Sequence, residues 1–416
     1  MNEQTLSIRP TQPAERIQLL DVLRGFALFG ILLVNMDYFI HPFQTILLPL
    51  PETVAGIDRA VAWFVKFIAE GKFYSIFSFL FGYGFTMMMM RSEVNQTNFL
   101  PIISRRYIVL FIIGLVHAFF IWVGDILALY SLLGFVLILF RKAKPKTLII
   151  WVIVLLAIPL ILLLFGAAAI ELGKSVPQGR EEIEKSFAQQ EAMYKKDIDR
   201  AYEVYSTGNF GEIIEQRAYD MRFMSFATIF IGPSVFAMFL IGMYFGKRQI
   251  LQNLTSNIQL FKKIFWWGLI IGVIGNFVYA TLILPLPRFE PTFTLFIASF
   301  GQVVGAPALS LFFIAAFALL LNSNQNNNWL NYLAAPGRMA LSSYFMQSII
   351  CTLIFYGYGL GLFGKVGKVT GLILVIVIYG SQIFITNWWM KKFQYGPAEW
   401  LWRWLTYLNK PEMKRR

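Results

Sequence analysis

The sequence predicts an all-α polytopic membrane protein with about ten transmembrane helices and a helical loop on the outer side. Of its 416 residues, 57% are hydrophobic and 14% are charged, whereas soluble domains carry about 25% charged residues. Several apolar stretches of about 20 residues are long enough to cross a hydrocarbon core about 30 Å thick. This composition excludes soluble dehydrogenases, nucleic-acid-binding proteins and disulfide-stabilised scaffolds. The single cysteine, Cys351, lies within an apolar stretch and has no partner for a disulfide in the same chain.

The predicted spans follow the apolar stretches in chain order. They cover residues 22–40, 73–90, 107–122, 125–140, 147–170, 223–246, 264–284, 293–321, 340–360 and 369–390. An even number of crossings places both termini on the same side of the membrane. The first 20 residues lack the apolar core and cleavage site of a signal peptide, so we expect the first span to act as the insertion signal and to be retained.

The net charge of +13 indicates orientation in the membrane and not a nucleic-acid partner. Basic residues concentrate in the connections on the side of the termini, and such enrichment marks the cytoplasmic side. The basic connections are Arg105–Arg106, Arg141–Lys146, Lys247–Arg248, Lys262–Lys263 and the tail Lys414–Arg416. We therefore expect a multi-pass protein whose termini are both cytoplasmic and whose main partner is the lipid bilayer.

Five regions divide the chain. These are a cytoplasmic N-terminal segment (1–20), an N-terminal bundle of five spans (21–170), an extracytoplasmic helical loop (171–222), a C-terminal bundle of five spans (223–390) and a cytoplasmic amphipathic tail (391–416). In the tail, aromatic and charged residues between Gly396 and Arg403 have helical spacing, which favours an interfacial helix.

The outer loop carries an apolar stripe at intervals of three, four or seven residues, which is typical of an amphipathic helix. The stripe consists of Ile183, Phe187, Tyr194, Ile198, Tyr202 and Tyr205. Residues 208–211 interrupt it, and residues 210–221 predict a second, short helix. The loop is either a cap packed across the outer end of the bundle or a lid that admits a substrate from outside.

Charged groups within apolar spans are costly and need an explanation. Asp21 and Arg24, three residues apart at the start of the first span, share one helix face. They form either an anchoring ion pair or, through the arginine, a site for an anionic ligand such as a phosphate. Arg338, before the ninth span, either contributes to the same phosphate site or follows the positive-inside rule.

His117 is the main candidate for chemistry, because it lies about 15 Å into the third span. Its imidazole is either a general base or a histidine satisfied by a neighbouring helix. The tight hairpin that follows brings Asp125 back towards His117, so Asp125 can orient the ring, cap the fourth span, or do both. Because no Ser or Cys is adjacent to His117 in the sequence, direct transfer with a histidine base is simpler than transfer through a Ser or Cys nucleophile.

Other polar residues near the span ends are weaker candidates. His41, at the outer interface, is either unremarkable or functional, and Lys72 is either a snorkelling anchor or a contact for a polar acceptor. Tyr344 and Gln347 follow Arg338 on the ninth segment and are candidate contacts for a substrate. Two separated histidines and one cysteine make a metal site improbable, so we expect no metal.

Several ordered motifs resemble the YeiB-like bacterial membrane family, over nearly the whole chain. They are Leu20–Ala27, Lys72–Phe73 with Leu80–Gly82, Gly114–His117 with Trp122–Leu127, Gly337–Tyr344 and Gly396–Tyr407. The C-terminal half of that family is a domain of unknown function. The resemblance implies a protein of the bacterial cytoplasmic (inner) membrane.

The family is also similar to wider transmembrane acyltransferases, such as heparan-α-glucosaminide N-acetyltransferase and the acyltransferase-3 proteins. The shared pattern is Asp21, Arg24 and Gly25 followed by Asn35. This resemblance implies acetyl-CoA or another acyl-CoA as the donor, a histidine base, a small acceptor such as a sugar or glycan, and a homodimer. The glucosaminide enzyme has its histidine after the first span, near His41, whereas the YeiB-like pattern favours His117.

We therefore predict an acyltransferase that moves an acyl group, with acetyl as the expected one, from cytoplasmic acyl-CoA to a hydroxyl or amine acceptor at or beyond the membrane. The catalytic residues are His117 and Asp125, and the donor site is formed by Arg24, Asp21 and Arg338. Residues proposed to contact the substrates are Lys72, His41, Asn35, Tyr344 and Gln347. The alternatives are a permease for a small anionic or sugar-like solute and a catalytically silent scaffold.

Overall fold

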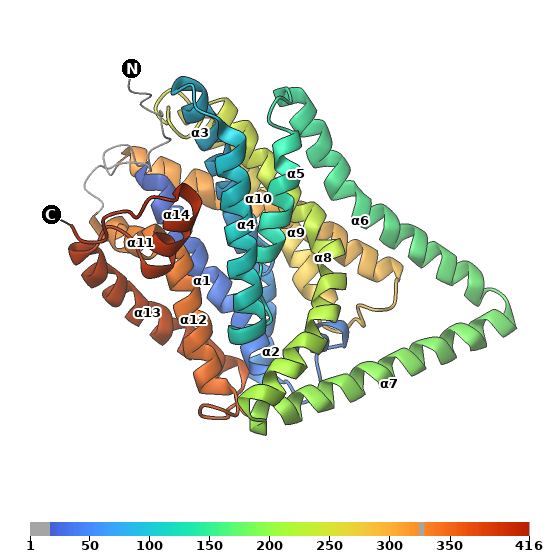
Figure 1. The fold of residues 1–416 in the computed structure, drawn as a ribbon. Coiled ribbons are helices and arrows are strands. Elements are labelled where there is room, and N and C mark those ends of the chain that lie inside the picture. Colours follow the sequence, from blue (N-terminus) through green and yellow to red (C-terminus); the bar gives the residue numbers. More distant parts are fainter. Residues whose placement is uncertain (1–16, 324–327, 416) are drawn as a thin grey trace, which may run out of the picture.

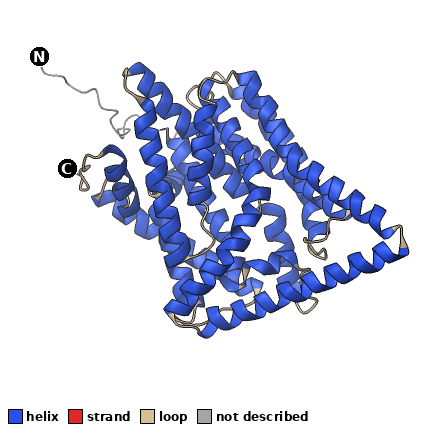
Figure 2. Ribbon diagram, turned by 45° about the vertical axis from the view of Figure 1, so that its right-hand side comes forward, coloured by secondary structure: helices blue, strands red, loops and turns tan. Residues whose placement is uncertain are grey.

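The protein is an all-α multi-pass membrane protein, as predicted. The computed structural model describes residues 17–323 and 328–415, so most of the predicted N-terminal segment lies outside the described residues. Within these ranges every long element is a helix and no strand forms (Figure 2). The helices are α1 (Gln18–Ile40), η2 (Phe43–Leu47), α2 (Gly56–Ile68), α3 (Lys72–Val94), α4 (Phe99–Val116), η3 (His117–Ile121), α5 (Leu127–Leu139), α6 (Pro145–Lys174), α7 (Pro177–Thr207), α8 (Phe210–Lys247), α9 (Ile258–Ile283), α10 (Phe293–Ser323), α11 (Asn328–Arg338), α12 (Ala340–Phe355), α13 (Lys368–Lys392) and α14 (Pro397–Tyr407).

Each of the ten predicted spans coincides with a helix. Among the described residues, eight helical stretches are long and apolar enough to cross a membrane, and α11 with α12 forms a ninth that is bent by 82°. The remaining predicted span is α5, which has only 13 residues and would be about 20 Å long. This length is shorter than a hydrocarbon core of about 30 Å.

Three details differ from the sequence-based predictions. Residues 210–221 do not form a separate short helix but are the first turns of α8, which has 38 residues. The side chains of Asn209 and Glu212 form a capping box that starts this helix, and no residue ends it before the membrane. The ninth span ends at Phe355 and not at 360, and the helices α2 and α11 were not predicted.

The two ends of the bundle can be distinguished by the elements that lie there. Ile17, at the start of α1, and Trp402 of α14 line the same cavity, so both described ends of the chain lie at one end, here called the terminal side. The helix α7 runs along the opposite end, at the bottom of Figure 1, which is here called the loop side.

The predicted stripe lies on the more buried face of α7. Ile198 and Tyr205 are buried, and the other stripe residues are half-buried. The C-terminal end of α7 packs against the loop after α12, where the Tyr205 carbonyl accepts a 2.8 Å hydrogen bond from the Gly357 amide. The helices α6, α7 and α8 form a triangle, in which α6 leans away from the bundle (Figure 1).

Glycines bring two helix pairs into backbone contact. A Cβ atom on Gly25 of α1 would lie 1.9 Å from the carbonyl oxygen of Leu333, and one on Gly337 of α11 would lie 1.9 Å from that of Asp21. Gly82 and Gly242 form the equivalent reciprocal contact between α3 and α8. Small residues allow this close approach, which drives helix association in a membrane. The α1–α11 contact brings together the segments that carry Arg24 and Arg338.

We expect Gly25→Ala to destabilise the protein by about 1–3 kcal/mol or more, because the added methyl group would collide with backbone atoms that cannot rotate away. Thermal unfolding in detergent, followed by tryptophan fluorescence, should show a lower Tm. Gly380→Ala is the matched control, since a Cβ atom there meets no atom within 4 Å. Equal Tm values for the two variants would contradict the close contact.

Candidate functional site

A cavity of about 660 Å³ lies at the terminal side, between α1, α3, α4, α12 and α14. Its walls are largely apolar and aromatic and include Ile126, Leu127 and Tyr344. Five arginines from separate helices or segments also line it, and we call it the arginine cavity. They are Arg24, Arg91, Arg106, Arg338 and Arg403.

Two carboxylates line the arginine cavity, and both are already engaged. Asp21 accepts a 2.8 Å hydrogen bond from Arg24, whose side chain remains 31% exposed. Glu399 of α14 accepts hydrogen bonds from the Leu341 and Ser342 amides and thereby caps α12. Burial raises the pKa of Glu399 above its usual value. With five arginines and two occupied carboxylates, the cavity presents positive charge to a ligand.

His117 lies where α4 changes from an α-helical to a π-helical turn. The Trp122 amide donates a 2.8 Å hydrogen bond to the His117 carbonyl, five residues earlier, which defines this wider turn. Such π-turns are frequent at functional sites. Arg217 of α8 donates to the Phe119 carbonyl at 3.3 Å and supports the turn from the loop side. The imidazole is completely buried.

Asp125 performs both roles that the sequence left open. Its Oδ2 lies 2.9 Å from Nδ1 of His117, and its Oδ1 accepts a 2.8 Å hydrogen bond from the Ala128 amide at the start of α5. Gly114 makes this arrangement possible, because a Cβ atom there would lie 2.8 Å from Oδ1 of Asp125. The short hairpin between α4 and α5 therefore holds a histidine and a carboxylate in one fixed geometry.

The second ring nitrogen of His117 has a partner that the sequence analysis missed. Nε2 lies 3.0 Å from the hydroxyl oxygen of Ser348, which is on α12 and 1% exposed. No serine is adjacent to His117 in the sequence, but the fold places Ser348 beside it. Ser348, His117 and Asp125 form a buried hydrogen-bonded chain, here called the triad.

Tyr344 separates the arginine cavity from the triad. It lines the cavity, its ring centre lies 4.9 Å from that of His117, and its hydroxyl donates a 3.0 Å hydrogen bond to the Gly124 carbonyl. The predicted substrate contact at Tyr344 therefore lies between the cavity and the candidate base.

Asn35 and Gln347 do not line the arginine cavity. Asn35 is half-buried on α1. Gln347 is buried and donates a 2.7 Å hydrogen bond to Gln382, which connects α12 with α13. In this structure Gln347 holds helices together, and neither residue lies at the surface that a cavity ligand would meet.

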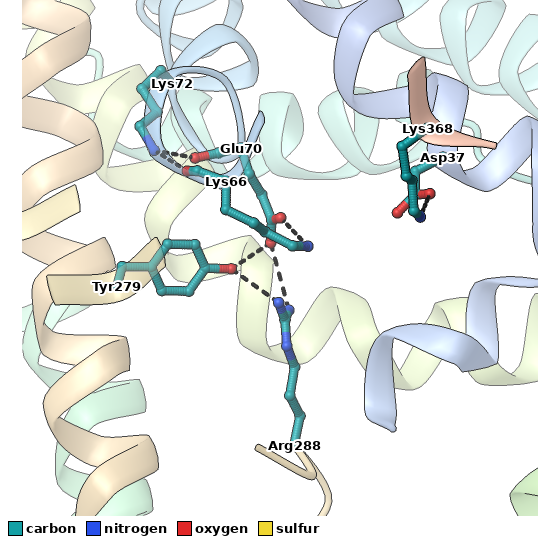
Figure 3. Close-up of polar contacts among 7 residues, drawn as sticks. All are labelled: Asp37, Lys66, Glu70, Lys72, Tyr279, Arg288 and Lys368. Carbon is teal, nitrogen blue, oxygen red and sulfur yellow. Dashed lines mark hydrogen bonds and ion pairs between the residues drawn. The ribbon is translucent and has the colours of Figure 1, made fainter. Parts of the chain in front are cut away.

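Lys72 belongs to a separate cluster of charged residues (Figure 3). Its buried ammonium donates 2.8 Å hydrogen bonds to the carbonyls of Lys66 and Glu70. The Glu70 carboxylate is bound by Lys66, Tyr279 and Arg288, and Asp37 pairs with Lys368 nearby. These groups satisfy one another, so the cluster connects α2, α9 and the 284–292 loop.

His41 lies at the loop side, after the end of α1. Its Nδ1 is 2.9 Å from the hydroxyl of Tyr202 on α7. Burial, together with the positive charge of Lys368, lowers the pKa of His41 to about 4. The imidazole is therefore neutral at pH 7 and contacts α7, whereas His117 lies beside the cavity.

Several residues of the site carry no clear sequence signal. Arg91, Arg106 and Arg403 fit the positive-inside pattern as well as they fit a ligand site. Ser348 follows Tyr344 by four residues and shares its helix face, which is the one periodic signal that points to it. Among the residues that the structure describes, no three or more His, Cys, Asp or Glu side chains form a group that could hold a metal ion.

The bond geometry predicts that neutral His117 carries its proton on Nδ1, because Asp125 can only accept there. In Asp125→Asn, the backbone N–H of Ala128 still donates to the side-chain oxygen at position 125. The side-chain NH₂ group then faces Nδ1 of His117 and can only donate to it. We expect the proton to move to Nε2 in most molecules. Ring ¹⁵N shifts of labelled protein measure this, and His41→Gln assigns the second histidine. Unchanged shifts would contradict the contact.

The lowered pKa of His41 predicts a pH dependence of stability. Unfolding restores a pKa near 6.5, so between about pH 6.5 and 4 the unfolded chain binds a proton that the folded protein does not. Stability should therefore fall as the pH falls through this window, by at most about 1.4 kcal/mol per pH unit. We expect the Tm of His41→Gln to fall less than that of the unmodified protein. Parallel pH profiles would contradict the assignment.

Comparisons with known proteins identify relatives over the full length. The chain is 36% identical over 421 residues to "Uncharacterized protein YxaH" of Bacillus subtilis (strain 168), covering 97% of each chain. It is 28% identical over 401 residues to "Uncharacterized protein YeiB" of Escherichia coli (strain K12), covering 94% of this chain and 96% of the relative. The names of these relatives assign no activity.

A family model described as "Protein of unknown function (DUF418)" matches residues 245–409, which run from the end of α8 to the residues after α14. No solved structure matches. The motifs around His117 precede the region that this model covers, and the full-length relatives extend the similarity to them. The chain therefore belongs to the family of YeiB-like membrane proteins that carry the DUF418 domain.

Proposed function

We propose that the protein is a transmembrane acyltransferase that uses acyl-CoA as donor and a hydroxyl or amine as acceptor. The observation that carries this proposal is the arginine cavity, whose lining residue Tyr344 lies beside the His117–Asp125 pair. A cavity lined by five arginines and by many apolar side chains suits a donor with phosphates at one end and an acyl group at the other.

The arginines would hold the phosphates of the donor. Arg guanidinium groups bind phosphate oxygens through paired, charge-assisted hydrogen bonds, and here they come from α1, α3, α4, α11 and α14. The apolar walls between Leu28, Leu80 and Leu110 would accommodate an acyl chain. The reactive carbonyl would then reach the region of Tyr344.

His117 would act as the base that activates the attacking group. Asp125 holds Nδ1–H, so the lone pair on Nε2 is available to take a proton. A general base typically contributes about 10²–10⁴-fold to a rate. The triad is excluded from bulk water, which favours transfer over hydrolysis.

The positive-inside rule assigns the terminal side to the cytoplasm of a bacterial inner membrane in this proposal. The donor would enter from the cytoplasm, where acyl-CoA is made. The acceptor, a small molecule such as a sugar or glycan, would approach from the loop side beneath α7. Labelling of engineered cysteines in intact cells tests this orientation.

We expect purified protein to bind CoA and acetyl-CoA saturably. Arg24→Ala should weaken binding about 10–100-fold, because it removes charge-assisted hydrogen bonds to phosphate. His117→Ala should leave Kd nearly unchanged, since His117 does not line the cavity. Isothermal titration calorimetry measures these constants, and Arg59→Ala on the exposed face of α2 is the charge-matched control.

Folded protein that binds no CoA would overturn the acyltransferase proposal. Solute counterflow in proteoliposomes that is insensitive to CoA would then favour a permease. If Arg24→Ala and Arg59→Ala weakened CoA binding equally, the effect would be one of general charge. The arginine cavity would then no longer be supported as the donor site.

A further inference from the structure

Both ring nitrogens of His117 are engaged, which restricts how it can act as a base. Nδ1 faces Asp125 at 2.9 Å and Nε2 faces Ser348 at 3.0 Å. We infer that Ser348 is the nucleophile that receives the acyl group, so that transfer proceeds through an acyl-serine. This inference rests on the proposed function and specifies the path of the acyl group.

The direction of the hydrogen bonds supports a nucleophilic serine. An ionised Asp125 accepts the proton on Nδ1, so Nε2 of the neutral ring is an acceptor. The Ser348 hydroxyl lies within reach of Nε2 at 3.0 Å and of the Tyr344 carbonyl at 3.1 Å. The two contacts compete for the single hydroxyl proton. Because Nε2 needs a donor, whereas the Tyr344 carbonyl also accepts the backbone hydrogen bond of α12, the inferred reactive form is the one in which the hydroxyl donates to Nε2. This is the arrangement in which histidine activates a serine.

The surroundings of the triad fix its geometry. The ring of Phe345 stacks on His117 at 5.0 Å and 8°, and the ring of Trp122 lies at 6.5 Å. Ser348 is 1% exposed, and the side chain of Asp125 is 2% exposed. An acyl-serine in this position would be protected from water until an acceptor arrived.

Access from the arginine cavity depends on Tyr344. Tyr344 and Ser348 are one helical turn apart on α12, and Tyr344 lines the cavity. Rotation of the Tyr344 side chain away from the Gly124 carbonyl would open the path from the cavity to Ser348. The donor carbonyl would then lie beside the serine, while the phosphates remain at the arginines.

The chemistry balances without any further reagent. His117 Nε2 takes the hydroxyl proton as Ser348 Oγ attacks the thioester carbonyl, the C–S bond breaks, and the proton passes to the sulfur of the departing CoA thiol. In the second half, Nε2 takes a proton from the acceptor hydroxyl or amine. The acceptor attacks the ester carbonyl, and Ser348 Oγ leaves with that proton. The serine and the histidine return to their starting forms.

The test uses full-length purified protein with [¹⁴C]acetyl-CoA and no acceptor, quenched in acid at short times. We expect release of about one CoA thiol per chain and label bound to the protein through Ser348, located by peptide mass spectrometry. Ser348→Ala and His117→Ala should lose the label more than 100-fold. Ser348→Cys should retain it as a thioester that neutral hydroxylamine cleaves.

Ser343→Ala is the matched control, because Ser343 is also buried on α12 and its hydroxyl bonds to the Pro336 carbonyl instead of His117. It should label normally. Acetyl-CoA binding without any labelled serine, or labelling that persists in Ser348→Ala, would overturn the inference and leave the proposed function standing. Absence of CoA binding by folded protein would overturn both.

Discussion

The bonds of a single carboxylate organise the centre of this protein. Asp125 starts α5 with one oxygen and fixes the ring of His117 with the other. Because its side chain is only 2% exposed, neither bond competes with water, and a buried carboxylate without such partners would be costly. The fixed ring in turn presents Nε2 to α12, so the position of α12 against α4 is part of the same arrangement.

The sequence predicts the fold well because the bilayer imposes a strong and local constraint. A span must be apolar over its whole length, and this requirement is readable without knowing any partner. That criterion does not detect α2 and α11, because these helices have only 13 and 11 residues and neither is a continuous apolar stretch. Hydropathy also does not reveal that residues 210–221 continue into the sixth span as one helix, because polar and apolar parts of a helix differ in hydropathy whether or not they are joined.

The site is predicted only as far as its contacts are local. His117 and Asp125 are eight residues apart across a tight hairpin, so their contact follows from the sequence. Ser348 is 231 residues from His117, and only the packing of α12 against α4 reveals that they meet. The same limit applies to the arginines of the cavity, which come from helices far apart in the chain. Their gathering around one cavity is what favours the proposed ligand site over ordinary orientation charges, and sequence alone cannot show it.

The cap on α12 has a consequence for how the protein is made. The Leu341 and Ser342 amides donate hydrogen bonds to Glu399, which lies 58 and 57 residues later in the chain, respectively. At roughly 5–20 residues per second, a ribosome needs several seconds to add that stretch. During this interval the start of α12 lacks its partner, while α1 has long been in the membrane. The arginine cavity therefore closes around residues from the first and the last helix only when synthesis is nearly complete, so an incomplete chain cannot display a finished site.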